Sequence, residues 1–166
     1  MLHNIDPKQI TGNPFAMIGD QWMLITAGNG EVCNPMTASW GGVGILWGAP
    51  VATCYVRPQR YTKQFLDGQE YFTLTFFPEQ YRKELTLCGT KSGRDVDKVK
   101  ECGFTVKTAS CGAPYFEEAS LVLVCRKRFA QEMDPANIPE DVKASFYPAQ
   151  DYHTMYIGEI VEVLQR

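Results

Sequence analysis

Four glycines lie between positions 41 and 48, and this cluster constrains the fold more than any other feature of the chain. Glycine is unfavourable inside a helix, and so dense a cluster instead permits bulges, turns and the close approach of another backbone or a ligand. Two short apolar runs, 22–27 and 50–56, flank the cluster and are bounded by turn-forming residues. Such runs favour buried β-strands. We therefore expect mostly extended structure between positions 22 and 56.

The rest of the chain predicts further strands and a few short helices. In 71–77, Phe72, Leu74 and Phe76 alternate with two threonines, which predicts a strand with one face in the core. About seven strands with two or three short helices predict a mainly β fold, a small antiparallel barrel, because closure removes exposed strand edges. Further strands are expected at 104–106, 113–116, 119–129 and 152–164, and helices at 61–66, 79–88 and 96–102.

Composition and charge exclude several classes of protein. A length of 166 residues predicts a single domain, residues 1–166. A net charge of −3 argues against broad binding to nucleic acid, which needs a basic surface. The N-terminal residues have no apolar core of signal-peptide length, and no apolar run approaches the roughly 18 residues of a membrane span. These features predict a cytoplasmic protein with no membrane partner.

The six cysteines show no metal-binding or disulfide pattern. None forms a Cys-x-x-Cys pair, and the chain has only two histidines, His3 and His153. Since free cysteine is among the most buried residue types, we expect buried, reduced thiols and no metal site. A redox or metal role is the alternative.

Two clusters of positive charge favour an anion site. Arg57 and Arg60 follow the strand predicted at 50–56, and Thr62 adds a hydroxyl at the start of a helix. Two guanidinium groups beside a helix start suit a phosphate monoester, although ordinary surface arginines are the alternative. In Ser92-Gly-Arg-Asp-x-Asp-Lys98, Ser92 or Asp95 could cap a helix, and two cations stand nearby. Alone, this second segment is a capping motif with charge pairs.

Two further segments suggest a flat ligand and a titratable group. Asn34 to Trp40 offers backbone groups and small side chains on which a planar polar ring could stack. Its alternative role is a strand entering the barrel through a proline-assisted turn. Near the C-terminus, Asp151 precedes His153 by two residues and could orient or charge its imidazole. A structural histidine is the alternative.

Four motifs together resemble the flavin reductase-like family, and in particular its flavoredoxin-type members. They occur in the order and approximate spacing of that family, and the resemblance covers positions 28 to 163. The motifs are Asn34-Pro-Met-Thr-Ala-Ser-Trp40, Arg57-Pro-x-Arg-Tyr-Thr62, Ser92-Gly-Arg-Asp-x-Asp-Lys98 and Asp151-x-His-x-x-Tyr-Ile-Gly-Glu159.

The resemblance implies an FMN-binding split β-barrel of Greek-key topology that forms a homodimer, with each flavin at the subunit interface. His153 would stand near the face of the ring where nicotinamide or substrate approaches, as the candidate catalytic residue. The implied ring and ribityl contacts are Asn34, Met36, Thr37, Ala38, Ser39 and Trp40. The implied phosphate candidates, between which the sequence does not choose, are Arg57, Arg60, Thr62, Ser92, Arg94 and Lys98.

The implied function is an FMN-binding oxidoreductase, an NAD(P)H-dependent flavin reductase that takes electrons from NADH or NADPH. One alternative is a flavoredoxin-type electron carrier that holds FMN and takes electrons from a protein partner. Another is a barrel without flavin chemistry that serves as a binding module. The proline-containing excursion at 134–149 could cover the flavin groove or contact the partner subunit.

Overall fold

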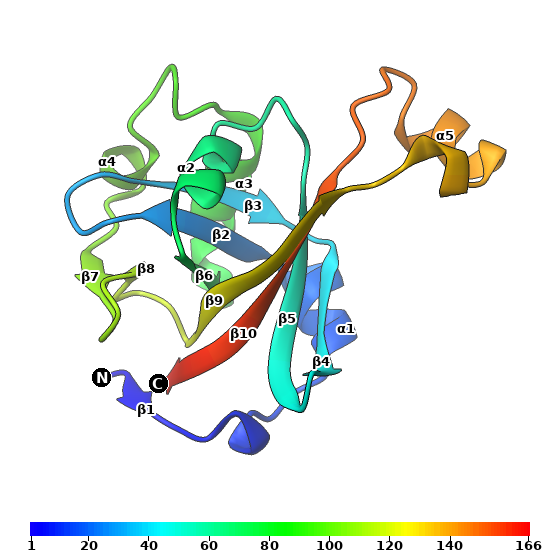
Figure 1. Ribbon diagram of the computed structural model, residues 1–166. Helices are drawn as coiled ribbons and strands as arrows, with labels where there is room; N and C mark the ends of the chain where they lie inside the picture. The colour runs from blue at the N-terminus through cyan, green and yellow to red at the C-terminus, as the bar shows by residue number, and fades with distance from the viewer.

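The structure is a computed structural model that describes residues 1–166, and Figure 1 shows a curled sheet with short helices around it. The strands are β1 (His3–Asn4), β2 (Met23–Gly28), β3 (Cys33–Ala38), β4 (Gly41–Leu46), β5 (Ala49–Val56), β6 (Tyr71–Phe76), β7 (Val106–Thr108), β8 (Pro114–Phe116), β9 (Leu121–Glu132) and β10 (Thr154–Gln165). The α-helices are α1 (Pro14–Ala16), α2 (Thr62–Gly68), α3 (Arg82–Thr90), α4 (Lys98–Cys102) and α5 (Glu140–Phe146). Four single-turn helical segments are η1 (Pro7–Gln9), η2 (Met17–Gln21), η3 (Glu79–Tyr81) and η4 (Pro135–Asn137).

The main sheet is antiparallel, with the strand order β3-β2-β6-β9-β10-β5-β4 and β1 paired to β10. Strands β3 and β4 follow each other in the chain, joined only by Ser39 and Trp40, yet they stand at opposite ends of this order. So short a link requires the sheet to curl until its two ends meet. The result is a barrel with an unpaired seam between β3 and β4, which confirms the predicted barrel fold.

Two hydrophobic clusters occupy the two sides of the curled sheet. The first fills the barrel and includes Phe72, Leu74 and Phe76 from β6. The second lies outside, where Leu85 of α3 joins Phe104, Phe116 and neighbouring apolar residues. Because this outer layer covers β6, Thr73 and Thr75 are fully buried too. The prediction of a single core face for 71–77 was therefore wrong.

Several local predictions also need correction. The helix expected after Ser92 begins only at Lys98, because Asp97, and neither Ser92 nor Asp95, accepts a hydrogen bond from the backbone N–H of Lys100. The Ser92 hydroxyl instead accepts from the backbone N–H of Arg94 and closes a turn. The sheets hold ten strands where about seven are predicted, because β1, β3 and β4 were not predicted as separate strands.

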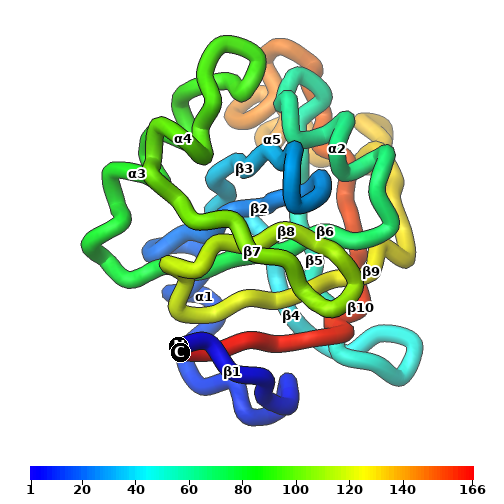
Figure 2. The backbone as a smooth tube through the Cα atoms, turned by 90° about the vertical axis from the view of Figure 1, so that its left-hand side faces the viewer, coloured from blue at the N-terminus to red at the C-terminus, as the bar shows by residue number.

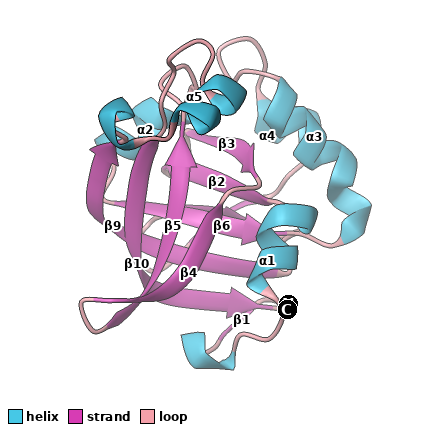
Figure 3. Ribbon diagram, turned by 90° about the vertical axis from the view of Figure 1, so that its right-hand side faces the viewer, coloured by secondary structure: helices cyan, strands magenta, loops and turns pink.

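Three of the helices gather at one end of the barrel, which positions the site. Figure 3 shows α2, α4 and α5 around the end where β3 and β5 finish. At the opposite end, β1 pairs with β10 through His3 and Gln165, so the two chain ends lie side by side (Figure 2). None of the helices has the length and the apolar character that spanning a membrane would require.

Candidate functional site

A recess of about 250 Å³ opens at the seam, where β3 and β5 end. Side chains from the end of β3 and its link to β4, from β5, from the loop after β5 and from the residue before β10 converge on it. The lining residues are Met36, Thr37, Ala38, Ser39, Trp40, Tyr55, Arg57, Arg60 and His153. The fold therefore brings together the first, second and fourth of the sequence motifs.

Tyr55 is the one lining residue that sequence reasoning missed. On β5, Ala52, Cys54 and Val56 are fully buried in the barrel, whereas the residues between them are partly exposed. Side chains two apart leave the same face of a strand, so Tyr55 shares its side with the residue at position 57. This period of two, counted back from Arg57, is the signal that could have identified it.

Both arginines of the recess have partners within the chain. Arg57 Nη1 lies 3.0 Å from Asp151 Oδ1, and its Nη2 donates to the carbonyl of Phe146 at 3.0 Å. Arg60 donates to the carbonyls of Gly89 and Cys88, at 3.0 and 3.3 Å, beside the C-terminal end of α3. A guanidinium has five N–H donors, so each arginine keeps some for an anion in the recess.

His153 is held by a hydroxyl. The Tyr147 hydroxyl oxygen and His153 Nδ1 lie 2.6 Å apart, and the Trp40 ring centre is 5.3 Å from the imidazole centre. Burial, assisted by the nearby Arg57 charge, lowers the pKa of His153 to about 4. The imidazole is therefore neutral near pH 7. The expectation that Asp151 orients it was wrong, because the Asp151 carboxylate bonds Arg57 and Gln59 instead.

The excursion at 134–149 contacts the seam. Tyr147 is buried, and the Arg57 Cζ atom lies 4.9 Å from the centre of its ring. Phe146 meets Trp40 edge-on, with ring centres 5.4 Å apart. This end of the excursion thus holds side chains of the recess. Two adjacent aromatic residues ahead of Pro148, the only aromatics of this segment, are the signal that could have singled them out.

Two of the remaining predicted residues lie behind the recess and not in its lining. Asn34 and Thr62 are buried, and Asn34 Nδ2 donates to Thr62 Oγ1 at 2.7 Å. The loop at Gly93 packs directly on this pair, because a Cβ at that position would stand 1.9 Å from Asn34 Oδ1. Glycine is required there by close approach. Neither Asn34 nor Thr62 lines the seam recess.

The cations of the third motif also lie away from the recess. Arg94 donates to the carbonyl of Gln59 at 3.0 Å and stacks over Tyr61. Lys98 is 3% exposed and donates to the carbonyls of Pro35 and Cys88, each at 2.9 Å. Burial, followed by repulsion from Arg60, lowers the pKa of Lys98 to about 8. Arg94, Lys98 and Asn34 line a separate recess of about 530 Å³, and Ser92 lines neither.

A wider recess of about 530 Å³ adjoins the site and shares Ser39, Trp40 and Tyr55 with it. Its other side chains come from the N-terminal helices, β4, the residue after β9 and the excursion, among them Phe15, Met133 and Tyr147. Trp40 stands in the lining of both. The seam recess therefore opens toward a larger, more apolar surface.

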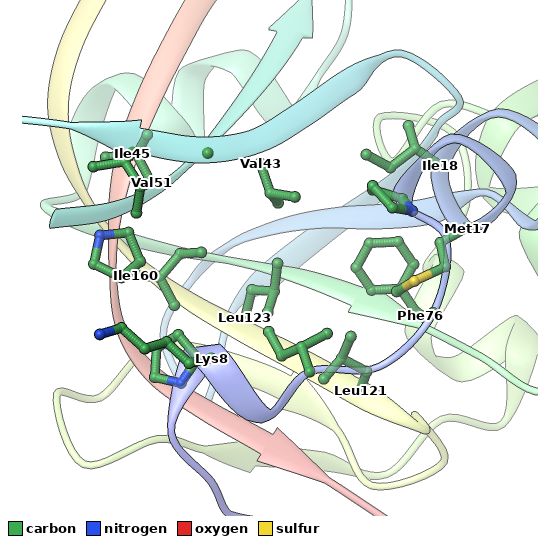
Figure 4. Close-up of a pocket in the computed structure, with 16 residues that line it drawn as sticks. Lys8, Met17, Ile18, Val43, Ile45, Val51, Phe76, Leu121, Leu123 and Ile160 are labelled. Atoms are coloured by element: carbon green, nitrogen blue, oxygen red, sulfur yellow. The ribbon is translucent and has the colours of Figure 1, made fainter.

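A fourth cavity, of about 330 Å³, lies between the N-terminal segment and β4 (Figure 4). Its lining is almost wholly apolar, with Phe76, Leu123 and Ile160 on the barrel side and Lys8 as the one charged residue. None of the predicted site residues lines it. Its chemistry differs completely from that of the seam recess.

The cysteines follow the prediction in part. All six are free, and Cys54, Cys88 and Cys125 are buried, but Cys111 is exposed because it lies in the turn between β7 and β8. Nowhere do three His, Cys, Asp or Glu side chains come together in a group that could hold a metal ion.

Comparison with known proteins identifies the family. The profile of the flavin reductase-like domain matches residues 16–166. No curated protein sequence matches the chain significantly. The fold is similar to that of a flavoredoxin from Methanosarcina acetivorans, with a TM-score of 0.71 and 22% identity over 98% of this chain and 76% of that one.

Two further solved structures share the fold. An FMN-binding protein from Thermus thermophilus with bound p-hydroxybenzaldehyde has a TM-score of 0.71 and 18% identity, over 99% of this chain and 82% of that one. The NADH:FAD oxidoreductase SgcE6 of Streptomyces globisporus C-1027, in complex with NAD and FAD fragments, has a TM-score of 0.66 and 18% identity, over 88% and 74%. With the domain match spanning most of the sequence and the barrel in common, this chain belongs to the flavin reductase-like family.

Proposed function

We propose that residues 1–166 form one FMN-binding domain and that the protein is a cytoplasmic, homodimeric oxidoreductase that takes electrons from NADH or NADPH. The observation that carries the proposal is the seam recess, where Arg57 and Arg60 stand beside Trp40, Tyr55 and His153 in a flavin reductase-like chain. When bound, FMN would supply the hydride-accepting chemistry, which no protein side chain offers.

The walls of the recess fit a flat polar ring. Strand β3 pairs only with β2, so the backbone groups on its other edge are free of sheet hydrogen bonds and face the seam. The segment from Met36 to Trp40 therefore offers amide and carbonyl groups to a ring edge, while its small side chains allow close approach. We propose that these residues bind the ring of FMN, as the sequence motif implies.

The positive end of the recess fits a phosphate. Arg57 and Arg60 are our choice for the phosphate ligands, since both line the recess and both retain unused N–H donors. We propose that Asn34, Thr62 and Lys98 act indirectly, by supporting the residues that line the recess, because their polar groups are buried and hydrogen-bonded within the protein. Ser92 and Arg94 stay proposed as outer contacts of the same phosphate.

His153 would act as a neutral donor beside the reacting atoms. If the Tyr147 hydroxyl donates to Nδ1, the imidazole proton sits on Nε2, which can then donate to a ligand. The depressed pKa keeps the ring uncharged near pH 7. For His153→Ala we expect a large fall in turnover with FMN still bound. Unchanged turnover would return the residue to a structural role.

A second copy would complete the seam. Strand β4 is an edge strand, and on its hairpin Ile45 and Trp47 are 72% and 65% exposed. Trp47 adopts φ 50°, a turn position that normally favours Asn or Gly, so its indole is placed there at a conformational cost. This apolar edge continues into the recess that adjoins the site through Val43. Ile45→Glu is expected to shift the protein from dimer to monomer in light scattering after size-exclusion chromatography, whereas Glu31→Gln on the far hairpin is the matched control.

One experiment separates the proposal from its alternatives. Apo-protein titrated with FMN should quench flavin fluorescence, and anaerobic addition of NADH or NADPH to the complex should bleach the flavin absorbance. Binding without bleaching by either nucleotide would favour a flavoredoxin-type carrier that takes electrons from a protein partner. Absence of FMN binding would leave a non-redox binding module.

A further inference from the structure

Cys88 and Cys102 bring two thiols into contact behind β3. Cys88 lies on α3 and Cys102 is the last residue of α4, and their Sγ atoms are 3.7 Å apart. Bonded sulfurs stand about 2 Å apart, so a gap of less than 2 Å separates this pair from a disulfide. The two thiols come from two short helices, which the loop 91–97 connects.

The two thiols differ in access. Cys88 is fully buried, whereas Cys102 is partly exposed and can meet a dissolved oxidant first. Burial raises the pKa of both thiols, so both are protonated near pH 7. Thiols of high pKa exchange slowly, but the disulfide they form resists reduction, because their thiolates are poor leaving groups.

We propose that Cys88 and Cys102 form an intramolecular disulfide when the protein meets a small-molecule disulfide such as glutathione disulfide. The Cys102 thiolate attacks one sulfur of the oxidant, forms a mixed disulfide and releases one glutathione. The Cys88 thiolate then attacks the Cys102 sulfur and releases the second glutathione. The protein loses two electrons and two protons, and the oxidant gains them as two thiols.

The disulfide would close a ring around the segment that packs on β3. Within this ring, Gly93 lies against Asn34 and Arg94 stacks over Tyr61. The Cys88 carbonyl accepts hydrogen bonds from Arg60 and Lys98. The bond would therefore tie both ends of this segment together next to those two cations. This inference concerns the thiols alone and holds whether or not the recess binds flavin.

The test uses the purified chain in the Cys111→Ser background, which removes the exposed thiol. One sample is incubated with glutathione disulfide and one with a phosphine reductant, and both are alkylated, digested with trypsin and analysed by mass spectrometry. Cleavage after lysine and arginine places Cys88 in peptide 84–91 and Cys102 in peptide 101–107. We expect an intact mass, measured before alkylation, that is lower by about 2 Da in the oxidised sample, the two hydrogens lost, and a link between these two peptides after digestion. Closing this ring should also raise Tm by roughly 5 to 10 °C.

Two variants keep the result interpretable. Cys102→Ala should abolish both the mass loss and the rise in Tm, and Cys33→Ala, at the other partly exposed cysteine, should leave both unchanged. A stable mixed disulfide at Cys102 without the link to peptide 84–91 would overturn the proposal. So would a link from Cys102 to any other cysteine, or no cross-link at all in the oxidised Cys111→Ser protein.

Discussion

The seam recess and the apolar barrel cavity are two openings of one barrel with opposite chemistry. The barrel cavity is the larger, about 330 Å³ against about 250 Å³, but its lining carries a single charge, on Lys8. The seam recess joins two arginines and a histidine to two aromatic rings. Between these two openings, size alone would select the one that does not suit the phosphate-bearing ligand proposed above. The contrast teaches that strand ends and the loop after β5, where polar side chains need not be buried, form the candidate site.

The largest expected effect separates stability from binding. Leu123 lines the barrel cavity and its side chain is 2% exposed, so Leu123→Ala removes buried methyl groups and enlarges the void. The change should lower the free energy of unfolding by about 2 to 5 kcal/mol. Urea unfolding measures the loss. FMN affinity per folded molecule should stay within about twofold, since the residue does not touch the seam. A tenfold loss of FMN affinity in the folded variant would show that the barrel cavity and the seam recess are coupled.

The second effect concerns pH and His153. Its pKa, about 4 in the folded protein, lies below the ordinary value near 6.5, so between these values the unfolded chain binds the proton and the folded one does not. The residue therefore destabilises the fold as pH falls from about 6.5 to 4, by roughly 1 to 3 kcal/mol, and has no such effect above pH 7. His153→Gln should flatten this part of the stability profile relative to wild type. Identical profiles would show that the imidazole is not held neutral.

The third effect tests the charges of the seam. The double variant Arg57→Ala with Arg60→Ala should weaken FMN binding at least tenfold, which is about 1.4 kcal/mol. Fluorescence titration measures the affinity. Lys8→Ala removes the one charge of the barrel cavity and is the matched control, with affinity expected to stay as in wild type. Equal losses of FMN affinity in both variants would show that the effect comes from the net charge of the protein and not from contacts made by Arg57 and Arg60.

The smallest effect tests how His153 is oriented. Tyr147→Phe keeps the ring against Arg57 but removes the hydroxyl that lies 2.6 Å from Nδ1, at a cost of about 1 kcal/mol in stability. In nitrogen NMR, wild type should show one imidazole tautomer with the proton on Nε2. The variant should show a mixture. A single unchanged tautomer would mean that another group positions the ring.

Local patterns predicted most of the fold and part of the site. The glycine cluster and the apolar runs around it predicted strands close to β2 and β5, and the motif at 34–40 predicted residues that line the recess. The burial of Thr73 could not be predicted, because it depends on an outer layer contributed by α3 and residues beyond position 100. Tyr147 could have been noticed from the aromatic pair ahead of Pro148, but its contact with His153, six residues later, depends on how the chain turns between them.

The pairing of β5 with β10 determines when the site can assemble. Val56 pairs with Thr154, almost 100 positions later, and His153 directly precedes that strand. Contacts so distant in sequence form late and slow the folding of a barrel. The recess around Met36, Tyr55 and Arg57 would thus form only after β10 has paired with β5. In refolding experiments we expect the distance between Trp40 and His153 to reach its native value only in the last phase, after the β2–β3 hairpin has formed.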